Sequence, residues 1–346
     1  MIEGKRRLMQ MKKLLGVLLT MLLVLVGCGN NADEDVKGAT YKIGTASLTH
    51  QSGTDAGEED GKFALNTYFA HVVLSEDGKI VDVYIDVAQN NVTFDANDKL
   101  TGFSGQANAP TTKKELGDDY GMTRNPAAIA EWYVQMDSFE QYITGMTVEE
   151  VLNIPVYQKD DAHQAVPDVE DLKSSVTITI ENYQAVVKMA ADNAVTVENV
   201  DKVGTRSITT AAQTGIEILT DFATIALDAD GKIVYAALDT MQSKATSEGG
   251  VITLTDVVTT KKQLGDDYGM MKNPTAVAEW DDQIAAFEAY FIGKTVSEVV
   301  GMPTYVKDEN HDRVADVEDL KSTVTINIGQ YLDVVDKAAK NAEAVK

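Results

Sequence analysis

Hydrophobic and polar residues alternate along two early stretches of the chain in the pattern of β-strands. Phe69–Leu74 and Ile80–Val87 are rich in apolar and β-branched side chains, and Glu76-Asp77-Gly78-Lys79 lies between them. An Asp-Gly pair between two such runs is a strong short-range signal for a β-hairpin. The pattern recurs at Thr224–Leu227 and Ile233–Leu238, around Asp230-Gly231. The sequence therefore predicts two hairpins.

A helical pattern follows each predicted hairpin. Asn125-Pro126 is typical of a helix start, with Asn as N-cap and Pro at the first helical position. Apolar residues then recur every three or four positions, which predicts one buried helix face with both tryptophans in the core. They are Ile129, Trp132, Met136, Phe139 and Ile143 in the first stretch and Val277, Trp280, Ile284, Phe287 and Phe291 in the second. Gly145 and Gly293 are expected to end these helices, and the capping boxes Thr147-x-x-Glu150 and Thr295-x-x-Glu298 predict a shorter helix after each.

These patterns agree because the chain contains one unit twice. Residues 111–194 match residues 259–342 at a constant offset, with 50 of 84 positions identical, including LGDDYGM and DVEDLKS. The segments before them correspond more weakly. A unit of this length is a domain and not a short solenoid repeat. We predict two tandem homologous α+β domains, 40–198 and 199–346, each an antiparallel sheet or hairpin followed by helices.

The end of each repeat has two interpretations. Residues 174–180 (SSVTITI) alternate like a strand, but Val176, Ile180, Tyr183, Val187 and Ala190 have helical spacing, as do Val324, Ile328, Tyr331, Val335 and Ala338. The helical interpretation covers more residues, and we prefer it. It places Ser174 or Ser175 at a helix N-terminus, where unpaired N–H groups favour an anion such as phosphate.

The amino-terminal segment predicts export and lipid anchoring. Five basic residues precede an almost wholly apolar run, Leu14–Val26, which is too short to span a bilayer and has the form of a secretory signal. It ends in Leu25-Val26-Gly27-Cys28, which resembles the lipobox of bacterial lipoproteins. We predict a signal peptide at 1–27, lipidation of Cys28, and a flexible tether at 28–39. The expected location is the extracytoplasmic face of the cell membrane, as in Gram-positive bacteria.

Charge and cysteine content exclude several functions. Acidic residues outnumber basic ones by 54 to 30, for a formal charge of -24, so nucleic acid is a poor partner. The single cysteine excludes an intrachain disulfide and a cysteine-rich zinc site. No motif of a hydrolase or nucleotide-binding enzyme is present, and no metal site is predicted. An electron carrier or a binding protein fits better than a catalyst.

Each repeat contains a short motif that begins with an Asp and ends with a Thr, at Asp171–Thr177 and Asp319–Thr325. This motif and the order of elements over the whole repeat resemble a known family, the FMN-binding domains of bacterial membrane electron-transfer systems and lipid-anchored extracellular flavoproteins. In that family the flavin phosphate is esterified to a Thr in a pattern close to Asp-x-x-Ser/Thr-Gly-Ala-Thr. The corresponding stretches are Asp171-Leu172-Lys173-Ser174-Ser175-Val176-Thr177 and Asp319-Leu320-Lys321-Ser322-Thr323-Val324-Thr325. The Asp, Ser and acceptor Thr match, whereas Ser-Val and Thr-Val replace Gly-Ala. The Gly-rich loop followed by Trp132 also has the order seen in the family.

The resemblance implies FMN, bound covalently or non-covalently near Thr177 and Thr325, with membrane redox proteins or a flavin transferase as partners. Ser174, Ser322, Asp171 and Asp319 are the other motif residues. Tyr120 and Tyr268, in the two LGDDYGM loops, are candidates for stacking on a flat ring. The expected function is extracytoplasmic electron transfer. The alternative is a non-redox surface binding lipoprotein or antigen that keeps the scaffold without the cofactor, and the loss of Gly-Ala favours it.

Overall fold

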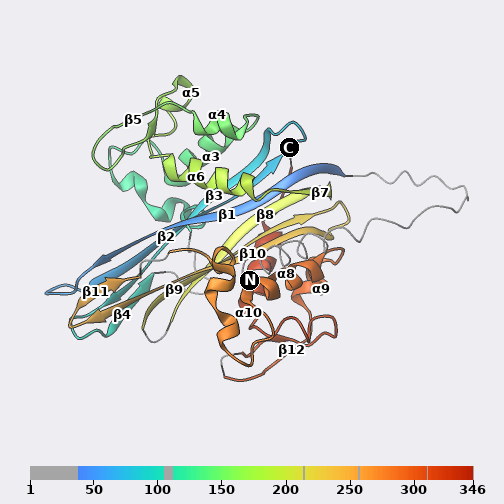
Figure 1. The fold of residues 1–346 in the computed structure, drawn as a ribbon. Coiled ribbons are helices and arrows are strands. Elements are labelled where there is room, and N and C mark those ends of the chain that lie inside the picture. The colour runs from blue at the N-terminus through green and yellow to red at the C-terminus, as the bar shows by residue number, and fades with distance from the viewer. Residues whose placement is uncertain (1–37, 105–111, 213–214, 256–257, 310, 346) are drawn as a thin grey trace, which may run out of the picture. The chain divides into compact units, whose positions relative to one another are not determined.

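The computed structural model describes residues 38–346, except 105–111, 213–214, 256–257, 310 and 346. The predicted signal peptide, Cys28 and most of the predicted tether lie outside the described residues. Residues 38–346 form one compact unit with two similar halves, each an antiparallel sheet followed by helices (Figure 1). The predicted α+β fold class is therefore confirmed. Within the described part of the chain, no helix has the length and apolar character needed to cross a membrane.

The first half contains a five-stranded antiparallel sheet with the order β4-β3-β2-β1-β7. Its strands are β1 (Ala39–Thr54), β2 (Gly61–Leu74), β3 (Ile80–Phe94), β4 (Leu100–Ser104) and β7 (Val195–Val200). The predicted hairpin joins β2 to β3, and Gly78 has φ 79°, a conformation that glycine adopts without strain. β7 runs across the predicted boundary between the two repeats and pairs with β1.

The second half repeats this sheet with the order β11-β10-β9-β8-β14. Its strands are β8 (Lys202–Ala211), β9 (Ile216–Leu227), β10 (Ile233–Glu248), β11 (Val251–Leu254) and β14 (Glu343–Ala344). The second predicted hairpin joins β9 to β10. Two short ribbons lie outside the sheets, β5 (Val156–Tyr157) with β6 (Val166–Pro167) and β12 (Thr304–Tyr305) with β13 (Val314–Ala315).

Helical segments follow each sheet in the same order. In the first half they are α2 (Lys113–Leu116), η1 (Gly117–Tyr120), η2 (Met122–Arg124), α3 (Trp132–Ile143), α4 (Val148–Leu152), α5 (Glu170–Lys173) and α6 (Glu181–Asp192). In the second they are α7 (Lys261–Leu264), η3 (Gly265–Tyr268), η4 (Met270–Lys272), α8 (Trp280–Phe291), α9 (Val296–Val300) and α10 (Gly329–Lys340). Both predicted capping boxes are confirmed, at the starts of α4 and α9.

The predicted helix start at Asn125-Pro126 is wrong. The long helix begins at Trp132, with Glu131 as its N-cap residue. Asn125 accepts a hydrogen bond from the amide of Ala127 at 3.0 Å, so its side chain stabilises a local turn and not a helix start. Ile129 is 48% exposed and does not extend the buried face of the helix.

Glycines kept in both halves allow the last helix to pack closely on its sheet. A Cβ on Gly44 in β1 would lie 1.9 Å from the carbonyl oxygen of Ala190 in α6. A Cβ on Gly204 in β8 would lie 2.3 Å from the carbonyl oxygen of Ala338 in α10. Both contacts are far shorter than van der Waals distance, so only glycine permits this approach.

The two sheets face each other, and the helices of each half cover the outer face of its sheet (Figure 1). Phe69 of the first half stacks on its counterpart Phe222, with ring centroids 6.2 Å apart. Phe63 and Ile218 belong to a second apolar cluster shared by the sheets. The facing sheets therefore give the two halves a common core.

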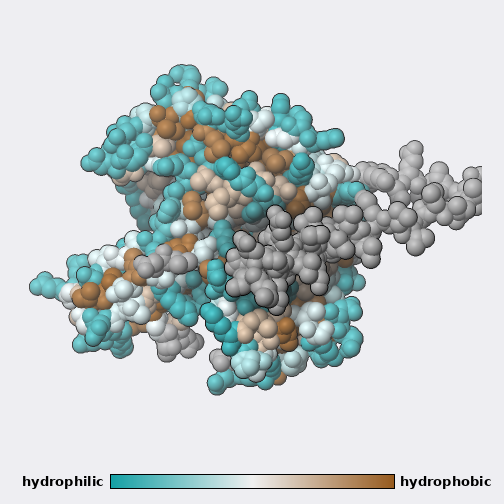
Figure 2. Space-filling view, in the orientation of Figure 1, coloured by the Kyte–Doolittle hydropathy of each residue, from teal (hydrophilic) through white to brown (hydrophobic). Residues whose placement is uncertain are grey.

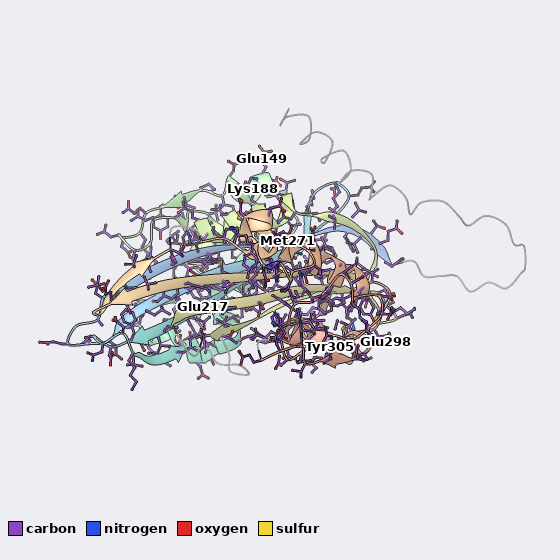
Figure 3. All side chains as sticks on the ribbon, turned by 60° about the horizontal axis from the view of Figure 1, so that its bottom comes forward. Glu149, Lys188, Glu217, Met271, Glu298 and Tyr305 are labelled. Carbon is purple, nitrogen blue, oxygen red and sulfur yellow. The ribbon has the colours of Figure 1, made fainter. Side chains whose placement is uncertain are left out.

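The outer surface is mainly polar, as the net charge requires. In the space-filling view hydrophilic residues cover most of the molecule, and a hydrophobic band lies over the helices of the first half (Figure 2). Acidic side chains such as Glu149 and Glu298 project outward from α4 and α9 (Figure 3).

Candidate functional site

A cluster of aromatic rings and one lysine lies where α2, η1, α3 and α6 meet. The Trp132 Nε1 group donates a hydrogen bond to the Tyr183 hydroxyl at 3.0 Å. The Lys113 ammonium lies 5.0 Å from the ring centroid of Tyr120 and 5.2 Å from that of Trp132, within cation–π distance of both. We name Lys113, Tyr120, Trp132 and Tyr183 the aromatic–lysine cluster.

The second half contains the same cluster, formed by Lys261, Tyr268, Trp280 and Tyr331. Lys261 lies 5.2 Å from the ring centroid of Tyr268 and 5.5 Å from that of Trp280. Trp280 and Tyr331 have ring centroids 6.1 Å apart. The predicted site residues Tyr120 and Tyr268 are thus brought together with a cation and a tryptophan in each half.

The lysine of the first cluster is unusual in its environment. Burial lowers the pKa of Lys113 to about 8. Burial also raises the pKa of Tyr120 and of Tyr183, so both phenols stay protonated near neutral pH. Among the ion pairs of the described residues, none includes Lys113 or Lys261. The nearest charge interactions of the two lysines are with buried aspartates, Asp86 for Lys113 and Asp221 for Lys261.

Gln135 connects α3 to the predicted flavin-acceptor threonine. The buried Gln135 Oε1 accepts hydrogen bonds from the Thr177 backbone N–H at 2.8 Å and the Thr177 hydroxyl at 3.2 Å. Gln283 accepts the corresponding bonds from Thr325 at 2.9 and 3.3 Å. Gln135 is one helical turn from Trp132, so the residue that binds Thr177 and the tryptophan of the aromatic–lysine cluster lie on one buried face of α3.

The predicted helix over the flavin-like motif is wrong in its first residues. α6 begins at Glu181 and α10 at Gly329, so Thr177 and Thr325 lie in irregular segments before the helices and are half-buried. Ser174 is the C-cap residue of the one-turn helix α5 and does not start a helix. The Thr177 amide donates to the Gln135 side chain and the Ile180 amide to the Ala165 carbonyl, so this backbone is hydrogen-bonded outside the helical pattern.

The remaining motif residues are exposed. Asp171 lies in α5, and Ser174 follows it. Asp319 and Ser322 lie in the corresponding turn of the second half and are also exposed. These four exposed side chains belong to the two segments that end at Thr177 and Thr325. Within the same segments Leu172 and Leu320 are buried.

The backbone at the motif accommodates the residues that replace Gly-Ala. Among the described non-glycine residues, only Asp98 and Asn199 have positive φ, so Ser175 and Thr323 adopt ordinary conformations. A glycine is therefore not required there for backbone conformation. The half-buried threonine hydroxyl, the neighbouring rings and the nearby lysine are groups that suit a flavin phosphate ester.

Two residues that sequence reasoning missed fix the LGDDYGM loop. The Glu131 carboxylate accepts hydrogen bonds from the backbone amides of Met122 and Thr123 at 2.8 and 3.0 Å. Glu279 binds Met270 and Met271 in the same way at 2.7 and 3.0 Å. The signal was available in the sequence, because Glu-Trp-x-x-Gln is kept at 131–135 and 279–283.

A second pair that the sequence analysis missed binds a backbone amide of the strand next to the edge of each sheet. Glu140 in α3 accepts a hydrogen bond from the backbone amide of Ile85 in β3 at 2.5 Å, and Lys114 binds the same carboxylate at 2.7 Å. Burial raises the pKa of Glu140 to about 7. Glu288 and Lys262 form the equivalent pair beside Leu238 in β10.

Cavities flank the lysine of the second cluster. One of about 400 Å³ is lined by Asp221, Lys261 and Tyr331, and another of about 220 Å³ by Lys261, Leu264 and Tyr268. Asp221 occupies the place that Tyr68 has in the first half, where the Tyr68 ring lies 5.7 Å from Tyr183. The described residues contain no group of three or more His, Cys, Asp or Glu side chains placed to hold a metal ion.

A short part of the chain is similar to a known protein. No protein-family profile matches the chain, and no solved structure matches it significantly. A chlorophenol reductase from Desulfitobacterium hafniense is 35% identical over 96 residues, which is 25% of this chain and 29% of that protein. The similarity thus spans less than a third of either protein.

Proposed function

We propose that this protein is a lipid-anchored extracytoplasmic redox protein in which each half carries FMN esterified to a threonine, Thr177 or Thr325. The observation that carries the proposal is the repeated arrangement around these hydroxyls. In each half a buried glutamine binds the threonine, and one helical turn earlier on the same helix a tryptophan packs with a tyrosine and a lysine. The partial similarity to a protein named as a reductase supports the same class of chemistry.

Different residues of each half would bind different parts of the cofactor. Thr177 and Thr325 supply the ester oxygen. Lys113 and Lys261 supply positive charge beside an anionic cofactor, and Tyr120 and Tyr268 supply aromatic surface. When bound, FMN would provide the electron transfer, and the protein would provide position and electrostatics.

The amino-terminal segment supports the location. A lipid on Cys28, which lies outside the described residues, would anchor the chain at the outer face of the membrane. There the protein would meet its partners, a flavin transferase and membrane redox proteins. The strongly acidic surface agrees with a solvated domain outside the cell.

The second candidate function is a non-redox surface binding protein. Two observations favour it: Ser-Val and Thr-Val replace Gly-Ala in both copies, and a cavity lies between the halves. In this case the hydrogen bond of Thr177 to Gln135 has a structural role only.

Intact mass spectrometry of full-length protein, extracted from the membrane of a flavinylation-competent host, tests the proposal. We expect a diacylglycerol adduct and two FMN esters, with a visible flavin absorption band. Thr177→Ala and Thr325→Ala should each remove one FMN, and the double variant both. Thr179→Ala and Thr323→Ala, at neighbouring hydroxyls, are the matched controls and should keep both. An unmodified, colourless protein from that host would contradict the covalent proposal.

A further inference from the structure

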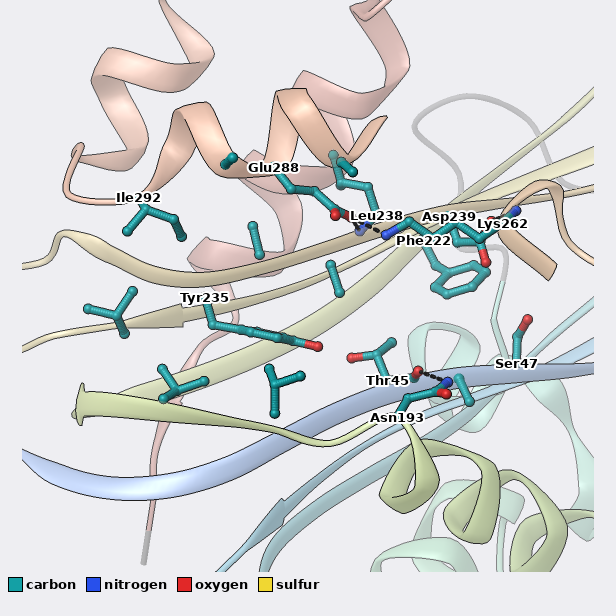
Figure 4. Close-up of a pocket in the computed structure, with 18 of the residues that line it drawn as sticks. Thr45, Ser47, Asn193, Phe222, Tyr235, Leu238, Asp239, Lys262, Glu288 and Ile292 are labelled. Carbon is teal, nitrogen blue, oxygen red and sulfur yellow. Dashed lines mark hydrogen bonds and ion pairs between the residues drawn. The ribbon is translucent and has the colours of Figure 1, made fainter. Parts of the chain in front are cut away.

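A cavity of about 710 Å³ lies between the two halves. This is within the range of small-molecule sites, about 300–1,000 Å³. β10, α7 and α8 of the second half form one side, and β1 and β7 of the first half form the other (Figure 4). Thr177 and Thr325 do not line it, so it is separate from the proposed flavin positions.

The two facing sheets have two edges. The cavity lies at the second edge, and the first edge, on the opposite side, is filled. There the Tyr84 ring stacks on His71 with centroids 6.0 Å apart. The Arg206 guanidinium lies 4.8 Å and the Lys114 ammonium 4.6 Å from the Tyr84 ring centroid. Tyr84 also donates a hydrogen bond to Asp86 at 2.8 Å. A large ring in contact with two cations thus occupies this edge.

The cavity exists because two residues at the second edge are small. Alanine occupies the positions where the first edge has the side chains that fill it. The pairs are Tyr84 and Ala237, and Arg206 and Ala46, and both alanines line the cavity. The scaffold around them is unchanged, since Glu288 still binds the Leu238 amide and Asp239 still binds the Lys262 amide. The cavity therefore results from smaller side chains, because the backbone hydrogen bonds are the same at both edges.

The lining combines apolar walls with a polar end. Side chains of Val195, Val197, Val234, Phe222, Leu238 and Ile292 form the walls. Asp239, Glu288 and Lys262 form the polar end, and Lys262 binds Glu288. The Ser47 hydroxyl, in a side chain only 3% exposed, also lines the cavity and has no hydrogen-bond partner among the described residues.

Charge selects the class of ligand. Two carboxylates face one ammonium, so the polar end has an excess of negative charge when both are ionised. Burial raises the pKa of Asp239 and of Glu288, because it disfavours the ionised form of each carboxylate. A flavin phosphate or another anion is disfavoured at this end.

We propose that the cavity binds a small amphipathic organic molecule, neutral or singly cationic, with its apolar body between β10 and β7 and its donor group at Asp239 and Glu288. Tyr235 extends across the cavity toward Thr45 and places an aromatic face beside the apolar body (Figure 4). This site goes beyond the proposed flavin chemistry and does not depend on it.

The test compares three probes with one apolar body: phenylbutylamine, phenylbutanol and phenylbutyrate. Binding to the full chain is followed by ligand-observed NMR and calorimetry. We expect saturable binding of the amine and the alcohol, and binding of the carboxylate at least about tenfold weaker, since like charges meet at the polar end. Absence of saturable binding by both the amine and the alcohol would overturn the proposal.

Variants distinguish the cavity from the acidic surface. Ala237→Tyr restores the ring found at the first edge and should abolish saturable binding. Ala46→Arg, which introduces the guanidinium found at the first edge, is an independent variant that fills the cavity should the tyrosine disturb folding. Val251→Tyr adds the same ring on the exposed β11 and should bind like the parent protein. Unchanged affinity in both plugged proteins, folded by circular dichroism, would refute the assignment.

Discussion

Gln135→Leu is the sharpest test of how the site is built. The substitution keeps the side-chain volume but removes an amide that is fully buried. Gln135 Oε1 accepts from the amide and hydroxyl of Thr177, and Gln135 Nε2 donates to the Ala130 carbonyl at 2.9 Å. The Thr177 amide and the Ala130 carbonyl thereby lose their partners. A buried group without a partner costs about 1–3 kcal/mol, but Thr177 is half-buried, so water replaces part of its lost hydrogen bonding. We expect the free energy of unfolding to fall by about 2–4 kcal/mol.

Urea unfolding followed by tryptophan fluorescence measures this loss. The chain has two tryptophans, Trp132 and Trp280, one buried in each half, so Trp132→Phe and Trp280→Phe backgrounds report the halves separately. Gln141→Leu, at an exposed position of the same helix, is the control and should change stability by less than about 0.5 kcal/mol. Because the sheets share a core, both tryptophans should report the Gln135→Leu shift. A change no larger than that of the control would refute the role of Gln135.

Two further predictions concern charge and capping. Between pH values of about 8 and 10.5 the unfolded chain retains a proton on Lys113 that the folded protein has released, so the free energy of unfolding should rise with pH across this window. The rise should reach at most about 3 kcal/mol and be absent in Lys113→Met, which pH-dependent urea titrations would show; an equal rise in the variant would contradict the burial of this ammonium. Thr147→Ala and Thr295→Ala each remove the N-cap of a capping box and should cost about 1 kcal/mol in thermal unfolding, whereas the exposed Thr144→Ala should cost less.

Local sequence signals predicted the elements whose determinants are close together in the chain. The Asp-Gly hairpins and the Thr-x-x-Glu helix starts were predicted correctly because the turn conformation and the capping hydrogen bonds involve residues within a few positions of each other. The division into two similar halves followed from the internal repeat. Thr177, Tyr120 and their counterparts were chosen as candidates by resemblance and by retention of the loop.

The errors arose where a distant residue determines the backbone. Val176 and Ile180 are fully buried and continue the helical spacing of α6, yet they lie before its first residue. They are buried because the segment packs under α3 and Gln135 binds the Thr177 amide. Hydrophobic spacing records burial and not hydrogen bonding, so an irregular segment held in the core has the same pattern as a helix turn.

The sequence by itself determined the duplication, the α+β order of elements and the acidic composition of this protein, because each depends on residue identity and short-range order. Tertiary structure alone decided that Lys113 lies near two aromatic rings. It also decided that the space beside Tyr235 is open, whereas the equivalent space at the other edge of the sheets is filled by Tyr84 and Arg206. The physical reason is that these features depend on which side chains meet across two sheets. Residues such as Ala46 and Ala237 are far apart in the chain, and only packing shows that together they leave room for a ligand.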